Sequence, residues 1–548
     1  MKARVERLDH LGIIAGVIKE LGLVEFIDSR IPNDAREELS CGEAVAGMII
    51  NGLGFSDRPL TLTPQFFENK ALSRLFREGV SAKHFNRFKL GRALDDCYAY
   101  GCDLLFAEAS AMICQKEGVD TKFNSLDTTA FALTGEYDPD CDEYKIAITH
   151  GYSKDHRPDL KQVVLEMMCS HDGGVPIVSK AWNGNASDAQ IFRKRAKALT
   201  DSFKASTTPR YLIADSKLYD EKTIKEGLGL IPFITRIPGT IKQENTTINA
   251  ALEKSLGEWS SLDEKHSFQV FHLEHYGVPQ RWIVVYSEER RNKAEKSVEA
   301  MRKKEEEKIG QALKKLSAEE FSSPDEARRA LKRGFNKSKF HDVSEGVIDE
   351  KKKYKTKGRP KAESAYERVY RIKGVLKERK KVIEEAIRQS SCFVIGTTIP
   401  TEELSDVEVV LAYKHQNNTV ERGFRFLKDP LMFTSSLFVK KTERIMGLLT
   451  VMTLALLVYS IAQRRLHKAL KELQETLPNQ IKKEIEKPTL RWIFQLLDGI
   501  ELVTILMENT SRVIISGLTP LRKKILGYFG ELVRKIYDLD QLPALKAS

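Results

Sequence analysis

The chain has 548 residues, of which 41% are hydrophobic and 30% are charged. This composition is that of a folded globular protein of about two to four domains, and it excludes an intrinsically disordered chain. The formal charge of +11 and the pI near 9.0 favour a polyanionic partner, although many basic proteins bind none.

The first 118 residues are expected to form a helical domain. Apolar residues recur there at helical spacing, and Ser40-Cys-Gly-Glu43 has the spacing of a capping box at the start of a helix. Helices are predicted over residues 11–21, 23–27, 44–53, 65–76 and 90–115.

From about residue 119 the hydrophobic period changes to that of an α/β domain. Strands are predicted over residues 122–131, 145–150, 163–169, 175–181, 211–214 and 232–235, and helices over 188–199 and 221–226. A turn at His171-Asp-Gly-Gly174 joins the strands on either side of it into a hairpin. Apart from the additional strand at 145–150, the predicted order is three strands, a helix, a strand, a helix and a strand. This is the order of a ribonuclease-H-like core, whose first part we assign to residues 119–239.

Residues 240–390 are predicted to interrupt that core as an insertion. Extended segments at 268–273 and 281–286 precede a charge-dense helical stretch that runs from Ser287 to Leu316 and beyond. Within the insertion, residues 351–361 contain seven basic residues and no acid, which is typical of a solvated linker. The tetrad Lys357-Gly-Arg-Pro360 also resembles a hook that places Arg359 in a minor groove, so both interpretations stay open.

The core is expected to resume over residues 391–470, and residues 471–548 are expected to be a helical C-terminal region. Residues 445–463 are uncharged and are long enough to span a bilayer. The segment contains several polar residues, and it follows directly on the helix that carries the candidate catalytic glutamate. We therefore predict a core helix that is buried on all sides, and no membrane partner.

Three carboxylates stand where a buried element meets a loop. Asp127 closes the extended run 122–127, Asp215 closes the run 210–215, and Glu421 opens a helical stretch at 420–428. Each alone fits a helix cap or a partner of the helix dipole. Together they predict one site for two divalent cations, with Mg²⁺ as the expected ion and Mn²⁺ as the alternative. Arg425 and Lys428 follow Glu421 on the same helix face, which suits contact with a phosphate backbone.

Five sequence blocks resemble those of DDE transposases of prokaryotic insertion sequences, in the sixteen-thirty-four branch of the IS-four-like superfamily. They are SLDTTA at 125–130, HGYSKDHRPDLKQ at 150–162, WNGNASD at 182–188, IADS at 213–216 and VERGFRFLKDP at 420–430. The resemblance spans about residues 5–470. It implies a ribonuclease-H-like catalytic core, cut-and-paste transposition, and Asp127, Asp215 and Glu421 as the metal-binding triad.

One departure from the family concerns the residues upstream of the glutamate. The family signature has Tyr and Arg seven and four residues before the Glu and Lys seven residues after it. Here Lys428 fits the signature, but the two upstream positions hold Lys414 and Asn417. The phosphate contacts that the family makes at those two upstream positions are therefore not assigned to Lys414 and Asn417.

The resemblance implies double-stranded DNA as the partner, both as terminal inverted repeats and as target, with a homodimer in the synaptic complex. The N-terminal helices would then recognise the DNA ends, with a bundle that binds no ligand as the alternative. Lys154 and Arg157 are further candidates for phosphate contacts, with a purely surface role as the alternative. Two other functions stay open: a nuclease of the same fold without strand transfer, and a non-catalytic DNA-binding protein.

The cysteines bear on the cellular compartment. Seven are present, none in a CxxC pair or at zinc-finger spacing. Their odd number and the lack of a signal peptide predict reduced thiols and a cytoplasmic protein.

Overall fold

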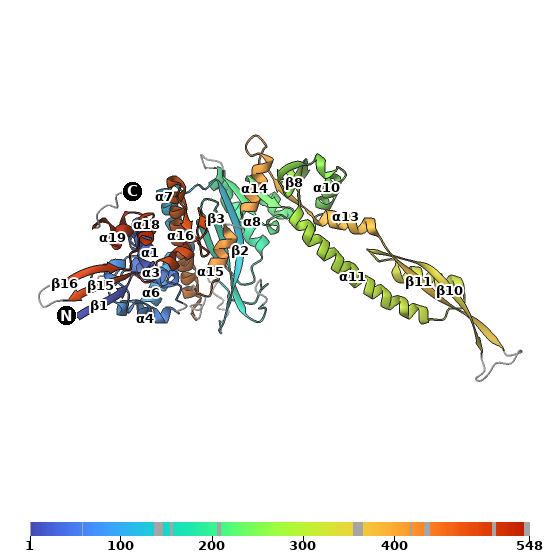
Figure 1. Cartoon of the computed structure of the whole chain (residues 1–548), viewed down its shortest axis with the longest axis horizontal. Coiled ribbons are helices and arrows are strands. Elements are labelled where there is room, and N and C mark those ends of the chain that lie inside the picture. Colours follow the sequence, from blue (N-terminus) through green and yellow to red (C-terminus); the bar gives the residue numbers. More distant parts are fainter. Residues whose placement is uncertain are drawn as a thin grey trace. The chain divides into compact units, whose positions relative to one another are not determined.

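The computed structural model describes residues 2–34, 36–56, 59–135, 137, 146–153, 157–204, 210–354, 365–416, 419–431, 439–506 and 511–541. The fold is mixed α/β and divides into two compact units (Figure 1). Unit 1 contains Met1–Thr235, Tyr276–Val278 and Glu408–Ser548, and unit 2 contains Arg236–His275 and Pro279–Val407. Unit 2 therefore extends beyond both ends of the predicted insertion, 240–390.

The N-terminal part of unit 1 is helical, as predicted. Its helices are α1 (Leu11–Leu21), α2 (Leu23–Arg30), α3 (Cys41–Leu53), α4 (Thr63–Phe67), α5 (Leu72–Leu75), α6 (Arg87–Tyr100) and α7 (Cys102–Glu117). The single helices expected over 65–76 and 90–115 are each two helices. Between α6 and α7 the cause is Gly101, whose φ of 108° is open to glycine and ends the first helix.

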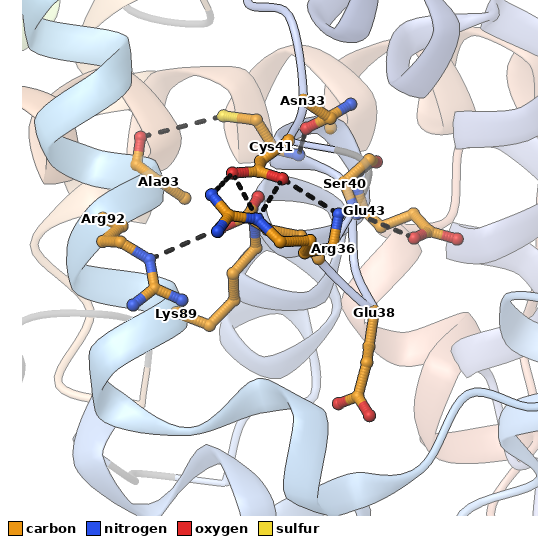
Figure 2. Close-up of polar contacts among 12 residues, drawn as sticks. Asn33, Arg36, Glu38, Ser40, Cys41, Glu43, Lys89, Arg92 and Ala93 are labelled. Atoms are coloured by element: carbon orange, nitrogen blue, oxygen red, sulfur yellow. Dashed lines mark hydrogen bonds and ion pairs between the residues drawn. The ribbon is translucent and has the colours of Figure 1, made fainter.

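Side-chain contacts fix the start of α3 (Figure 2). Ser40 Oγ accepts a hydrogen bond from the Glu43 amide at 2.9 Å, and the Glu43 carboxylate accepts one from the Ser40 amide at 3.0 Å. The predicted capping box is therefore confirmed. The side chain of Lys89 on α6 is buried nearby, where it pairs with Glu37 at 2.5 Å. This ion pair ties α6 to the loop that precedes α3.

The long helix α16 (Thr442–Leu473) is central to unit 1 (Figure 1). It packs against α1, α3, α6, α7 and strand β4 (Pro176–Trp182). Its most apolar stretch has a mean hydropathy of 2.2, and 89% of that stretch is buried inside the fold. In length and composition the helix resembles a membrane span, but its burial is that of the core helix predicted over 445–463.

Unit 1 also contains a mixed sheet. Its strands are β2 (Phe123–Leu133), β3 (Lys161–Ser170), β4, β5 (Tyr211–Ala214) and β6 (Phe233–Arg236), in the order β4-β3-β2-β5-β6. The pairs β2–β3 and β3–β4 are antiparallel, whereas β2–β5 and β5–β6 are parallel. Helix α8 (Asp188–Lys204) connects β4 to β5, and α9 (Glu221–Glu226) lies between β5 and β6. The predicted order of three strands, a helix, a strand, a helix and a strand is present.

One predicted strand of this region is wrong within the described residues. Over 146–150 the structure has only an isolated bridge, from Thr149 to Gln162. The segment lies at the margin of the sheet, and its alternating pattern is satisfied by that single pairing.

Unit 2 combines strands, helices and a long β-ribbon. Four strands follow one another in the order β12-β9-β8-β7: β7 (Ser260–Asp263), β8 (His266–His275), β9 (Val278–Ser287) and β12 (Cys392–Thr397). The helices are α10 (Lys242–Leu252), α11 (Glu288–Ala318), α12 (Pro324–Phe335) and α13 (Lys380–Ser390). The ribbon pairs β10 (His341–Tyr354) with β11 (Tyr366–Glu378) (Figure 1). The charge-dense helical stretch therefore ends at Phe335, and the first four residues of the predicted linker, 351–354, belong to a strand.

The C-terminal region is not wholly helical, contrary to the prediction. Strands β15 (Glu501–Leu506) and β16 (Ser511–Ser516) form an antiparallel sheet with β1 (Lys2–Arg7) at the other end of the sequence. A short hairpin pairs β13 (Leu477–Pro478) with β14 (Glu484–Ile485). The helices of this region are α17 (Leu490–Leu496), α18 (Pro520–Gly527) and α19 (Glu531–Ile536).

Candidate functional site

The two predicted aspartates lie on neighbouring parallel strands. Leu126 of β2 is paired with Ala214 of β5, so Asp127 and Asp215 are each one residue further along strands that run in the same direction. Both side chains are half-buried. Thr235 of β6 donates its hydroxyl to the Asp215 carbonyl at 3.1 Å, which ties the end of β5 to the next strand. The register therefore places the two residues side by side, where the pairing of β2 with β5 ends.

Asp215 directly follows the end of β5, as predicted, whereas Asp127 lies within β2, which continues to Leu133 because it stays paired with β3, so the prediction that Asp127 closes its strand is wrong. Each aspartate also has a local hydrogen-bonding role. Asp127 Oδ1 accepts a hydrogen bond from the Thr128 amide at 2.7 Å. Asp215 Oδ1 accepts one from the Ser216 amide at 2.7 Å and caps the short 3-10 turn Ser216–Leu218. The simpler interpretation of Asp215 as a cap is thus correct for one oxygen, and a carboxylate can cap a turn with one oxygen while the other binds a cation.

A lysine lies among the carboxylates of this region. Lys217 Nζ pairs with Asp188 Oδ2 at 2.6 Å. Burial by itself lowers the pKa of Lys217, but the hydrogen bond to Asp188 and the nearby charges of Asp188, Asp127 and Asp215 outweigh it and raise the pKa. Asp188 also accepts a short hydrogen bond from the Thr128 hydroxyl. The carboxylates of this region therefore stabilise the charged form of Lys217.

Asp188 and Lys217 were not among the candidate residues from the sequence. Asp188 opens α8, where an acidic residue commonly complements the helix dipole. Lys217 lies in a short turn two residues after Asp215. The available signal was the position of Asp188 at the end of the block at 182–188, one of the five that carry the family resemblance.

Glu421 lies in the first turn of α15 (Val420–Leu427) and is exposed. Helix α15 packs against β2, β3 and α16. Gly423 lies so close to β3 that a Cβ atom there would be 2.8 Å from Met167 Cε. Met167 is the cross-strand partner of Asp127, and directly paired residues share a face of the sheet. Helix α15 therefore covers the face on which Asp127 lies.

The structure brings the two aspartates together on adjacent strands and places the glutamate helix over the same face. Among the residues that the structure describes, however, no group of three or more Asp, Glu, His or Cys side chains is arranged to hold a metal ion. The metal cluster of Asp127, Asp215 and Glu421 therefore stays a prediction.

The basic candidates differ in their surroundings. Lys428 Nζ lies 5.8 Å from the ring centre of Phe131, which is four residues after Asp127 on β2 and hence on the same face. Arg425 is exposed on α15. Arg157 is paired with Asp159 at 2.7 Å. Three further candidates lie outside the described residues: Lys154, Lys357 and Arg359.

Comparisons with known proteins give little for this site. Residues 3–111 match a family described as a domain of unknown function, DUF4277, which covers the N-terminal helices and not the sheet. No curated protein matches the chain. The chain is similar to a cryo-EM structure of the piggyBac transposase synaptic complex with hairpin DNA, at 9% identity and a TM-score of 0.35, covering 100% of this chain and 86% of that chain. A TM-score this low does not establish a shared fold.

Proposed function

We propose that the protein is a DDE transposase. It would bind the terminal inverted repeats of its own insertion sequence, cleave at the ends, and join the freed 3′-OH to target DNA. The observation that carries the proposal is the parallel register of β2 and β5, which sets Asp127 beside Asp215. The element order of the sheet supports assignment to the ribonuclease-H-like class, and the helix with Glu421 covers the same face.

The donor set of this region fits Mg²⁺, because Mg²⁺ prefers carboxylate oxygens. The position of the Lys217 ammonium, paired with Asp188 and close to Asp127 and Asp215, indicates that these carboxylates attract a cation. Asp127, Asp215 and Glu421 would hold Mg²⁺, or Mn²⁺ in its place. When bound, the metal supplies activation of the attacking oxygen and stabilisation of the leaving oxygen.

The remaining residues of the proposed site would orient DNA. Arg425 and Lys428 extend from the helix that carries Glu421, so a phosphate backbone bound along α15 would lie beside the carboxylates. Arg157, Lys154, Lys357 and Arg359 are proposed as further contacts, the last two as a minor-groove hook. A homodimer would bring the two DNA ends together. Burial of α16 supports a core helix rather than a membrane span, and a cytoplasmic location is part of the proposal.

The test uses the full chain and a linear DNA that carries the chromosomal sequences flanking its gene. We expect cleavage and strand transfer in Mg²⁺ and binding alone in EDTA. Asp127→Asn keeps the side-chain volume and removes a ligand charge, so it should abolish cleavage and retain binding. The matched control is Asp325→Asn, which changes an exposed aspartate in the first turn of α12, away from the proposed site residues.

The outcomes separate the alternatives. Cleavage without joining would indicate a nuclease of the same fold. Binding without cleavage by the unaltered chain would indicate a non-catalytic DNA-binding protein. Undiminished cleavage by Asp127→Asn would refute the proposed mechanism.

A further inference from the structure

An open cavity of 810 Å³ lies within unit 1, on the side of α15 away from its core face. Its lining comes from the turn after β3, the end of α14 (Asp406–His415), helix α15, the C-terminal half of α16 and the segment before α17. A volume of this size is in the range of pockets for small ligands and accommodates a nucleotide. The chemistry of the lining therefore decides what it binds.

Three imidazoles contribute to the wall. The rings of His171 and His415 are 4.8 Å apart, and His467 Nε2 is 2.8 Å from the Pro488 carbonyl oxygen. Burial and the neighbouring His415 lower the pKa of His171 to about 3. Burial also lowers the pKa of His415 and His467, and both are lowered further by the charges of Lys487 and Arg422. The imidazoles are therefore neutral near pH 7 and stand in a positive field.

Two of the three acids in the cavity wall are neutralised by partners. Asp172 pairs with Arg464 at 2.7 Å. Glu475 pairs with Lys524 at 3.2 Å and accepts a hydrogen bond from Tyr528. These two carboxylates therefore do not offset the other cations of the lining.

An excess of positive charge remains. Within the part of the chain that the structure describes, Arg422, Lys471 and Lys487 form no ion pair, and a single unpaired acid, Glu486, faces them. Arg422 donates only to the Gly173 carbonyl oxygen, at 3.3 Å. Neutral imidazoles and unpaired cations around a water-filled cavity form a site for an anion.

The cavity adjoins the proposed active site. His171 Nε2 lies 2.7 Å from Ser125 Oγ, and Ser125 precedes Asp127 by two residues on β2. Two residues along a strand span about 7 Å and share a face of the sheet. Arg422, which lines the cavity, directly follows Glu421 in α15. A strand of nucleic acid lying at the carboxylates would therefore reach the cavity within about one or two nucleotides.

We propose that this cavity binds a nucleotide of a nucleic-acid strand through its phosphate, next to the cleavage site. The nature of the ligand rests on the proposed function, whereas the preference for an anion follows from the cavity itself. Arg422, Lys471 and Lys487 would contact the phosphate, and the rings of His171 and His415 would donate a hydrogen bond to it or contact the base. The N–H of neutral His467 is already donated to the Pro488 carbonyl oxygen.

The test measures binding of a fluorescent ten-nucleotide single strand to the full chain in EDTA, where no cleavage occurs. The double variant Lys471→Gln, Lys487→Gln should bind at least about tenfold more weakly, and the slope of log affinity against log salt should fall by about 0.7 for each lysine that no longer neutralises a phosphate. Both lysines are exposed, so the substitutions leave the core intact. Lys332→Gln changes an exposed lysine on α12 of unit 2, to which no DNA contact is assigned, and should change neither quantity.

Two further arms identify the ligand. A neutral-backbone oligonucleotide of the same sequence should bind the unaltered chain no better than the double variant binds the charged strand. Inorganic phosphate should compete with the charged strand for the unaltered chain. Equal affinity of the double variant and the unaltered chain for the charged strand would overturn the proposal. Loss of phosphate binding alone, with strand binding unchanged, would overturn the nucleic-acid assignment. Neither result depends on cleavage, so each is distinguishable from failure of the proposed function.

Discussion

Lys217 is surrounded by the carboxylates that are proposed to bind metal. Its ammonium pairs with Asp188 and lies near Asp127 and Asp215, so it offsets part of their negative charge. We expect Lys217→Gln to strengthen Mg²⁺ binding, because a cation would no longer compete with the ammonium. The measurement is the rise in thermal midpoint on addition of Mg²⁺, which should be larger in the variant. An exposed control is Lys222→Gln on α9. A smaller rise than in the unaltered chain would contradict the competing role.

His10 gives a prediction for stability against pH. Its ring stacks on Phe494 at 4.2 Å and bonds the Leu53 carbonyl oxygen, and burial lowers its pKa from 6.5 to about 4. Protons therefore bind the unfolded chain more tightly. The contribution of neutral His10 to the free energy of unfolding is complete above pH 6.5. It is lost as the pH falls toward 4, and the full shift corresponds to a loss of about 3 kcal/mol.

Denaturant unfolding at several pH values tests this contribution. Between pH 6.5 and 4, the free energy of unfolding should fall less steeply in His10→Gln than in the unaltered chain. His272→Gln, at an exposed position in unit 2, should retain the original slope. Identical slopes for His10→Gln and the unaltered chain would show that His10 does not carry the effect.

At the level of single residues, the sequence was informative where a residue type stands at an element boundary. Asp127 and Asp215 were chosen because each closes an extended run, which holds for Asp215 but not for Asp127 within β2, yet the parallel register does set them side by side. Asp188 was not chosen, because an aspartate at the start of a helix is common for reasons of capping alone. Its proximity to Lys217 arises from a tertiary contact across 29 positions of sequence, which local spacing does not encode.

The crossing of α6 and α16 depends on a glycine. A Cβ atom at Gly447 would lie 2.7 Å from the Leu94 carbonyl oxygen and 3.2 Å from its Cα atom, both of which are backbone atoms. We expect Gly447→Ala to lower the free energy of unfolding by about 1–3 kcal/mol, because the helices must separate. Gly310→Ala on α11 is the control, since nothing lies within 4 Å of a Cβ atom there and alanine favours a helix. Denaturant unfolding compares the two, and equal stability of Gly447→Ala and the unaltered chain would refute the close crossing.

Helices and strands that are apolar on one face or throughout could be predicted from the sequence. Strands that are exposed to solvent on both faces could not. The apolar runs of β2, β3 and β5 were found at nearly their observed bounds. Charged residues make up four of the six positions of β1 and half of the positions of β10, and the sequence predicted a helical domain around β1 and a helical stretch and a linker around β10. β1 pairs with β15 in the C-terminal region, and β10 pairs with the next strand, β11. A strand of this kind is stabilised by its partner's backbone and not by its own pattern.

On the scale of the molecule, α16 bears on whether the chain crosses a membrane. Its apolar stretch would pass as a membrane span by hydropathy, yet it packs against helices and a strand of unit 1. A core helix keeps this packing in water, so we expect the full chain in the supernatant after lysis and a high-salt wash. Leu456 is buried on α16, and Leu456→Asn should then destabilise the folded chain by about 2–5 kcal/mol, through poorer packing and an unsatisfied amide. Retention of the unaltered chain in the pellet until detergent is added would overturn the core-helix assignment, whatever the effect of the substitution.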